Sequence, residues 1–131
     1  MTENLKQQND LLSLKKMKKH CEEILEYLDI YNYSIEEFYK NHLFRNALSM
    51  AMFTIQELSY KGLSEKFIEE NREALNWGKM KGMRNRFGHS YDQMDLDVIF
   101  FSAIDDIPEM NDFLEIKIKE LEKEIENEEE E

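Results

Sequence analysis

The sequence is poor in residues that break helices or crosslink chains. Its 131 residues include four glycines, one proline and one cysteine. So few turn-forming residues argue against a β-sandwich or β-barrel, which needs a turn after every short strand. The single Cys21 cannot form an intrachain disulfide. Because Cys21 lies among apolar and charged residues at helical spacing, we expect a small buried side chain rather than a reactive thiol.

Long apolar runs and clusters of metal ligands are also missing. Residues 1–10 lack the apolar core of a signal peptide, and no segment approaches the roughly 18 apolar residues of a membrane span. We therefore expect a cytoplasmic protein with no membrane partner. The three histidines are His20, His42 and His89, and none belongs to an HExxH motif or pairs with a cysteine. We expect no metal site and no cofactor.

Negative charge is concentrated at the C-terminal end. Residues 120–131 hold eight glutamates and one lysine, a net −7 of the total −12. We expect a helical bundle domain over residues 1–120 and an acidic tail over 121–131, where a solvated helix end frays. A partner-binding or RNA-mimicking role for this tail is the alternative. The tail lowers general affinity for nucleic acid without excluding a local basic site.

Apolar residues at three- and four-residue steps dominate the rest of the chain. This spacing, with abundant Leu, Met, Glu and Lys, predicts helices. We expect long helices over about 5–29, 41–61 and 77–91, with a short helix at 34–40 and a short helix or turn within 63–75. Their short connections predict an all-α, antiparallel up-and-down bundle of four or five helices.

The expected ends of these helices follow from single residues. Ser34 and Glu37 match a capping box, Gly62 suits the stop of the 41–61 helix, and Asn76 can cap the next helix. Residues 96–104 are apolar enough to be buried. Asp106 is expected to cap a last helix that runs to about Ile125, with Pro108 tolerated in its first turn.

The most basic segment lies between Trp77 and Arg86. It holds four cations and no acid, in a chain that is acidic overall. Lys79, Lys81 and Arg86 are candidates for RNA binding, and Arg84 begins the run Arg84-Asn85-Arg86-Phe87-Gly88-His89-Ser90-Tyr91. From the residues alone, this run could be a hydrogen-bonded surface or interface network, or a catalytic site.

The chemistry of the run favours RNA cleavage without a metal. Histidine, here His89, is a residue type that serves as general acid or base. The planar fork of Arg84 matches a phosphate or a phosphorane, and Asn85 can orient the imidazole. These groups suit attack by a 2′-OH on the adjacent phosphate. On one straight helix, however, Arg84 and His89 lie about 140° apart. A two-fold dimer would bring two such helices to one cleft.

The segment resembles a known family. Arg84-Asn85-x-x-x-His89-x-Tyr91 is similar to the signature of HEPN-domain proteins, specifically the HepT-like toxins of prokaryotic toxin–antitoxin pairs. The similarity extends to residues 33–41, 45–65, 77–100 and 106–115. Within 45–65 the family usually has glycine between isoleucine and glutamate, whereas this chain reads Ile55-Gln56-Glu57.

The resemblance implies a homodimeric helical bundle with a composite ribonuclease site at the dimer interface. Arg84 and His89 would be its catalytic pair, with Asn85 and Glu57 supporting them. It also implies an MNT-type nucleotidyltransferase antitoxin that adenylylates Tyr91, although Tyr91 could equally be an interface aromatic. Related nucleotidyltransferase substrate-binding proteins carry a similar run. A non-catalytic accessory subunit is therefore the alternative, followed by a plain helical adaptor.

Overall fold

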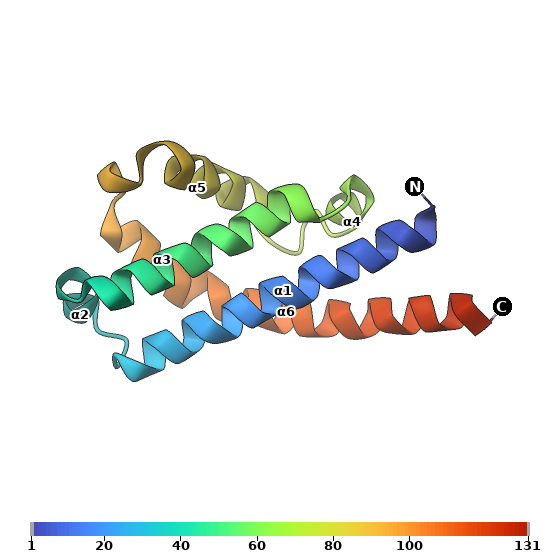
Figure 1. The fold of residues 1–131 in the computed structure, drawn as a ribbon, viewed down its shortest axis with the longest axis horizontal. Helices are drawn as coiled ribbons and strands as arrows, with labels where there is room; N and C mark the ends of the chain where they lie inside the picture. Colours follow the sequence, from blue (N-terminus) through green and yellow to red (C-terminus); the bar gives the residue numbers. More distant parts are fainter. Residues whose placement is uncertain (1, 131) are drawn as a thin grey trace.

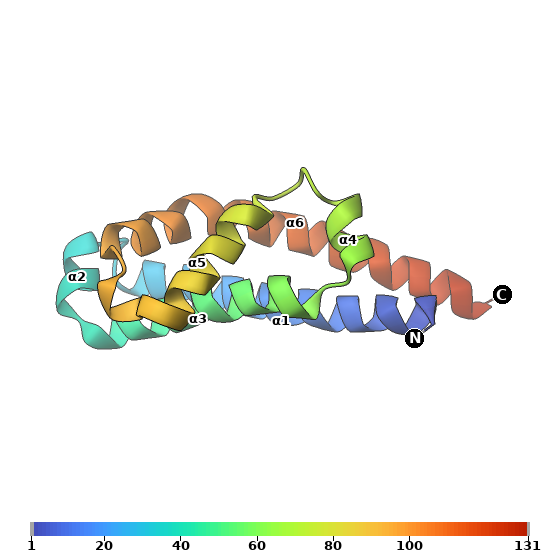
Figure 2. The same ribbon diagram turned by 90° about the horizontal axis from the view of Figure 1, so that it is seen from above.

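The computed structural model describes residues 2–130, and these form helices joined by short connections (Figure 1). The elements are α1 (Glu3–Ile30), α2 (Ile35–Lys40), α3 (His42–Glu57), the π-helical turn η1 (Leu58–Gly62), α4 (Glu65–Glu70), α5 (Trp77–Ser90), the 3-10 turn η2 (Tyr91–Gln93) and α6 (Leu96–Glu130). No residue between 2 and 130 is in a strand. The long helices α1, α3, α5 and α6 alternate in direction (Figures 1 and 2), which confirms the predicted all-α antiparallel bundle.

The core lies between the long pair α1 and α6 and the inner face of α3. Its fully buried members are apolar residues at helical spacing: Leu14, Met17, Ile24 and Leu28 from α1, Leu48 and Ile55 from α3, and Ile99, Phe100, Ile107 and Leu114 from α6. Cys21 is buried among them, as predicted. Burial raises the pKa of the Cys21 thiol to about 12, so the thiol stays protonated at neutral pH.

Two of the predicted helix starts are confirmed by their caps. The Asn76 side chain accepts the backbone N–H of Lys79 at 3.0 Å and so begins α5. The Ser34 hydroxyl accepts the N–H of Glu37 at 3.2 Å and so begins α2. In a capping box the Glu37 side chain would accept the N–H of Ser34. Here the N–H of Ser34 donates instead to the carbonyl of Tyr31 at 3.1 Å.

The last helix begins ten residues before the predicted cap. α6 starts at Leu96, where the Asp95 side chain accepts the N–H of Asp97 at 2.9 Å, and Pro108 lies inside the helix. An interior proline costs about 3 kcal/mol. Each fully buried apolar side chain contributes about 1.5–3 kcal/mol, and Ile99, Phe100 and Ile107 are all buried on this stretch. Burial therefore outweighs the proline, and the predicted start at Asp106 is wrong.

The acidic C-terminal run is helical as far as the structure describes it. α6 continues to Glu130, and Leu121 and Ile125 are buried within this stretch. Lys15 on α1 pairs with Glu122 at 3.3 Å. Residues 121–130 thus differ from the expected frayed end, since they bury apolar side chains. Residue 131 lies outside the described residues, and a domain boundary at residue 120 stays a prediction.

Gly62 ends the helical segment, as predicted, and also makes a close approach to α1. α3 ends at Glu57 and widens into the π-helical turn η1, which ends at Gly62. The Ser13 hydroxyl of α1 donates to the carbonyl of Gly62 at 2.6 Å. A Cβ atom at position 62 would lie 2.8 Å from the same hydroxyl oxygen. Glycine at this position therefore lets α1 and η1 touch.

Gly62→Ala is expected to destabilise the protein by about 1–3 kcal/mol, because overpacking displaces Ser13 or the turn. The matched control is Gly82→Ala, since a Cβ at Gly82 in α5 meets nothing within 4 Å. That change should stabilise the helix by about 0.5–1 kcal/mol. Urea unfolding followed by circular dichroism measures both. Equal effects of the two substitutions would contradict the close-approach explanation.

Candidate active site

Helix α5 carries most of the predicted site residues, and its core face fixes how they project. Met80 and Met83 are buried against the bundle. With these two side chains inside, Arg84 lies on the flank of α5 that faces α3 and η1, because its contacts go to those elements. The predicted helix over about 77–91 is confirmed to Ser90, and Tyr91 begins the 3-10 turn η2.

Arg84 is held by two of its predicted supporting residues. Its Nε donates to a carboxylate oxygen of Glu57, the last residue of α3, and its Nη1 donates to Oδ1 of Asn85 at 3.1 Å. The hydrogen bond and charge of Arg84 hold the pKa of the Glu57 carboxyl below its usual value. Glu57 is therefore ionised near neutral pH and orients the guanidinium.

His89 stands apart from this network. It lies exposed in the last turn of α5, and within residues 2–130 its side chain makes no hydrogen bond or ion pair. Arg84 and His89 belong to the same uninterrupted helix, so they keep the separation of about 140° expected from helical geometry. One chain therefore does not bring the two side chains of the predicted catalytic pair together.

Tyr91 lies beside an aromatic pocket that sequence analysis did not find. Its hydroxyl is 3.4 Å from Oδ1 of Asn46 on α3. Its ring contacts Phe87, which stacks on Phe53, with ring centroids 5.8 Å apart in each pair. The pocket has a volume of about 430 Å³ and is lined by Asn46, Ser49, Met50, Phe53, Phe87 and Tyr91.

Helix α3 exposes two large apolar side chains near this pocket. Met50, which lines the pocket, is 66% exposed, and Leu43, two turns earlier on the helix, is 68% exposed. Both lie on α3, whose apolar surface is wider than the part that the other helices of one chain bury. Periodicity does not separate a face buried in the bundle from one that remains on the surface.

The basic segment is partly neutralised by acids from other helices. Nζ of Lys79 lies 2.6 Å from a carboxylate oxygen of Asp106 on α6, as Arg84 lies against Glu57. Lys81 and Arg86 form no ion pair with residues 2–130. The segment is basic along the sequence, but only these two of its cations are without an acidic partner in the described part of the chain.

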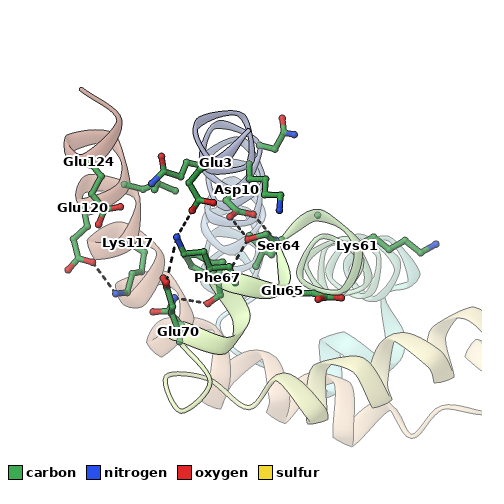
Figure 3. Close-up of a pocket in the computed structure, with 18 residues that line it drawn as sticks. Glu3, Asp10, Lys61, Ser64, Glu65, Phe67, Glu70, Lys117, Glu120 and Glu124 are labelled. Carbon is green, nitrogen blue, oxygen red and sulfur yellow. Dashed lines mark hydrogen bonds and ion pairs between the residues drawn. The ribbon is translucent and has the colours of Figure 1, made fainter. Parts of the chain in front are cut away.

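A second, wider pocket lies elsewhere and contains none of the predicted site residues. It has a volume of about 740 Å³ and lies between the start of α1, α4 and the C-terminal half of α6 (Figure 3). Its polar groups largely satisfy one another. The buried Asp10 carboxylate accepts the N–H and hydroxyl of Ser64 at 2.7 and 2.6 Å, and Lys66 pairs with Glu3. These contacts fasten α4 to α1.

The described part of the chain holds neither a cluster of metal ligands nor a membrane-spanning helix. Across residues 2–130, no three His, Cys, Asp or Glu side chains are grouped as ligands for a metal ion. None of the helices in this part of the chain combines the length and apolar character needed to cross a membrane.

Comparison with known proteins identifies the family of this chain. The bundle and the Arg84–Tyr91 run define a helical protein of the HEPN type, as the sequence resemblance predicted. The sequence profile of the family described as "Ribonuclease HepT-like" matches residues 17–116, which include every predicted site residue. The chain belongs to this HepT-like ribonuclease family, whose general activity is cleavage of RNA. No curated protein and no solved structure matches it.

Proposed function

We propose that this protein is an endoribonuclease toxin that cleaves RNA without a metal, through a site that two copies of the chain build together. The observation that carries the proposal is the arrangement on α5, where Arg84 is oriented by Glu57 and Asn85 while His89 is exposed nearby. These residues lie in a chain of a ribonuclease family.

The proposed reaction uses the hydroxyl of the substrate itself as the nucleophile. His89 of one copy removes the 2′-OH proton, and the oxygen attacks the adjacent phosphorus. Arg84 stabilises the charge that develops on the phosphorane. The bond to the 5′-oxygen then breaks, and His89 of the second copy supplies the proton that this oxygen takes. The products are a 2′,3′-cyclic phosphate and a 5′-hydroxyl.

A homodimer is required because one chain supplies one histidine at this site. A two-fold interface would place two copies of α5 around one cleft. The exposed apolar face of α3 around Met50 and Leu43, together with the half-buried Phe53, Phe87 and Tyr91, is a surface that such a partner would cover. This face adjoins the C-terminal end of α5, where His89 lies.

The experiment that tests the activity is incubation of the purified protein with single-stranded RNA in excess EDTA. Cleavage should persist, cyclic phosphate ends should form, and the rate should follow a bell-shaped dependence on pH because two histidines share the proton transfers. Cleavage that stops in EDTA and returns with a divalent cation would overturn the proposed mechanism.

The proposed partner is a small MNT-type nucleotidyltransferase antitoxin that adenylylates Tyr91. The Tyr91 oxygen would attack the α-phosphorus of ATP, lose its proton and release pyrophosphate. An anionic adenylyl group at this position would repel an RNA phosphate and fill the space beside His89. The half-buried ring keeps Tyr91 in place, and its hydroxyl contacts only the side chain of Asn46 among residues 2–130.

Co-expression with a nucleotidyltransferase encoded next to the gene for this protein should add one or more adenylyl groups to the wild-type chain. Intact-mass spectrometry measures the increment. Tyr91→Phe should lose the increment, because it lacks the nucleophilic oxygen. Tyr33→Phe is the matched control, since Tyr33 is an exposed tyrosine far from α5 in the sequence. Increments that persist in Tyr91→Phe would place the modification on another residue.

One observation favours a second candidate, a non-catalytic accessory subunit of a nucleotidyltransferase. Arg84 is already neutralised by Glu57, and a paired cation attracts phosphate less strongly than a free one. The two candidates differ in their effect on RNA. An accessory subunit would bind the nucleotidyltransferase and leave RNA intact, with or without EDTA.

A further inference from the structure

The turn η1 presents an aromatic side chain beside Arg84. η1 is a π-helical turn that follows α3 directly, and such insertions are frequent at functional sites. Tyr60 lies in the middle of this turn and is 47% exposed, although it carries a large apolar ring. The bundle core therefore does not account for the position of Tyr60.

Two cations of α5 lie over the ring of Tyr60. The guanidinium carbon of Arg84 is 5.0 Å from the ring centroid, and Nζ of Lys81 is 5.3 Å from it. Lys81 and Arg84 are three residues apart, so they project from neighbouring positions on one helix face. Cation–π contacts at these distances stabilise the ring in one orientation. Tyr60 is thereby a fixed surface beside the arginine that is proposed to bind phosphate.

The surroundings of Tyr60 are positively charged in an acidic protein. Lys61 follows Tyr60 in η1, and Lys81 has no acidic partner among residues 2–130. The one acid in contact with this group, within the same residues, is Glu57, which pairs with Arg84 and lies 3.7 Å from Nζ of Lys61. Three cations against one carboxylate leave the patch with a net positive charge.

An exposed ring flanked by cations is the combination that binds single-stranded nucleic acid. A base stacks on the part of the ring that the cations leave exposed, while the cations attract the adjacent phosphates. Bases in a duplex are stacked on one another and are not available for such contact, so the combination selects unpaired RNA.

We propose that Tyr60 and Lys81 form a subsite that stacks one unpaired base of the RNA next to the phosphate bound by Arg84. The inference rests on the proposed function, because it takes RNA as the ligand and Arg84 as the phosphate contact. Tyr60 and Lys81 are binding residues in this subsite, and they act by holding the RNA strand on the protein to the same extent before and during the reaction.

The test measures binding of a fluorescent single-stranded RNA, by anisotropy, to chains that carry His89→Ala and therefore cannot cleave it. Tyr60→Ala should weaken binding by about 5- to 100-fold, the effect of losing one base–aromatic stack. The affinity of the Tyr60→Phe chain for RNA should be within about two-fold of that of the chain with Tyr60 intact, because phenylalanine keeps the stacking face. Tyr33→Ala, at another exposed tyrosine, should leave binding unchanged. Lys81→Ala should weaken binding and reduce its dependence on salt.

A second readout uses chains with His89 intact. Tyr60→Ala should raise KM by a similar factor with kcat nearly unchanged, whereas a merely structural role through Arg84 would lower kcat and overturn the proposal. Unchanged binding in Tyr60→Ala, or equal losses in Tyr60→Ala and Tyr60→Phe, would also overturn it. If the wild-type chain binds RNA through Tyr60 but never cleaves it, the subsite stands and the proposed ribonuclease activity fails.

Discussion

His89→Ala and Arg84→Ala should each lower the rate of RNA cleavage by about 10²–10⁴-fold. A positioned general acid or base contributes a factor of this size, and removal of one group that stabilises transition-state charge costs about 10²–10³-fold. Both chains of the proposed homodimer carry the substitution, so the side chain is lost from both halves of the site. Single-turnover cleavage of an end-labelled RNA in EDTA measures these rates directly.

The controls for these variants come from the same residue types at other positions. His42→Ala removes an exposed histidine at the start of α3, and Arg72→Ala removes an exposed arginine that pairs with Glu69 at 3.3 Å. Neither should change the rate by more than about two-fold, since surface substitutions away from a site have small effects. Growth arrest on expression should disappear with His89→Ala. Arrest that survives this change would point away from catalysis.

Met50→Asp should convert the proposed dimer to a monomer and lower RNA cleavage at least about 100-fold at micromolar protein. A carboxylate without a partner is costly to bury in an interface, whereas on the free chain Met50 is already 66% exposed. The substitution therefore acts on association and leaves the fold of one chain intact. Sedimentation velocity measures the oligomeric state, and circular dichroism measures the fold.

Ile116→Asp is the matched control for the dimer face. Ile116 is an apolar residue of α6 that is 57% exposed, and it does not line the pocket beside Tyr91. This variant should stay dimeric and active. If Met50→Asp remains a dimer, the interface lies elsewhere on the molecule. If it becomes a monomer that still cleaves RNA at the wild-type rate, the composite site is wrong.

Much of the fold is visible in the sequence because helical periodicity is a local signal. The apolar spacing from Leu11 to Leu28 predicted α1, and Asn76 marked the start of α5. The remaining features depend on distant contacts. Pro108 is accommodated because neighbouring residues are buried against other helices, and the need for Gly62 comes from Ser13, nearly fifty residues earlier. Neither cause is contained in the local sequence.

Some residues of the candidate site can likewise be found from the sequence, and others only from the structure. Arg84, Asn85, His89 and Tyr91 lie within eight positions, so the sequence alone reveals the chemistry that they share. Their neighbours in space come from α3 and η1. Glu57 was expected only through the family resemblance, while Asn46, Phe53 and Tyr60 gave no signal at all. A residue that matters because of what packs beside it is found from tertiary structure alone.

The glutamate-rich end of α6 has a consequence for how RNA meets this protein. It lies at one end of the long axis, whereas the C-terminal end of α5 lies towards the opposite end (Figure 1). More than half of the net charge of the chain, −7 of −12, belongs to residues 120–131. A strand of RNA is repelled from the acidic end over about one Debye length, roughly 8 Å at physiological ionic strength. Under the proposed function, this repulsion favours approach of RNA to the part of the molecule away from the acidic end, where His89 lies.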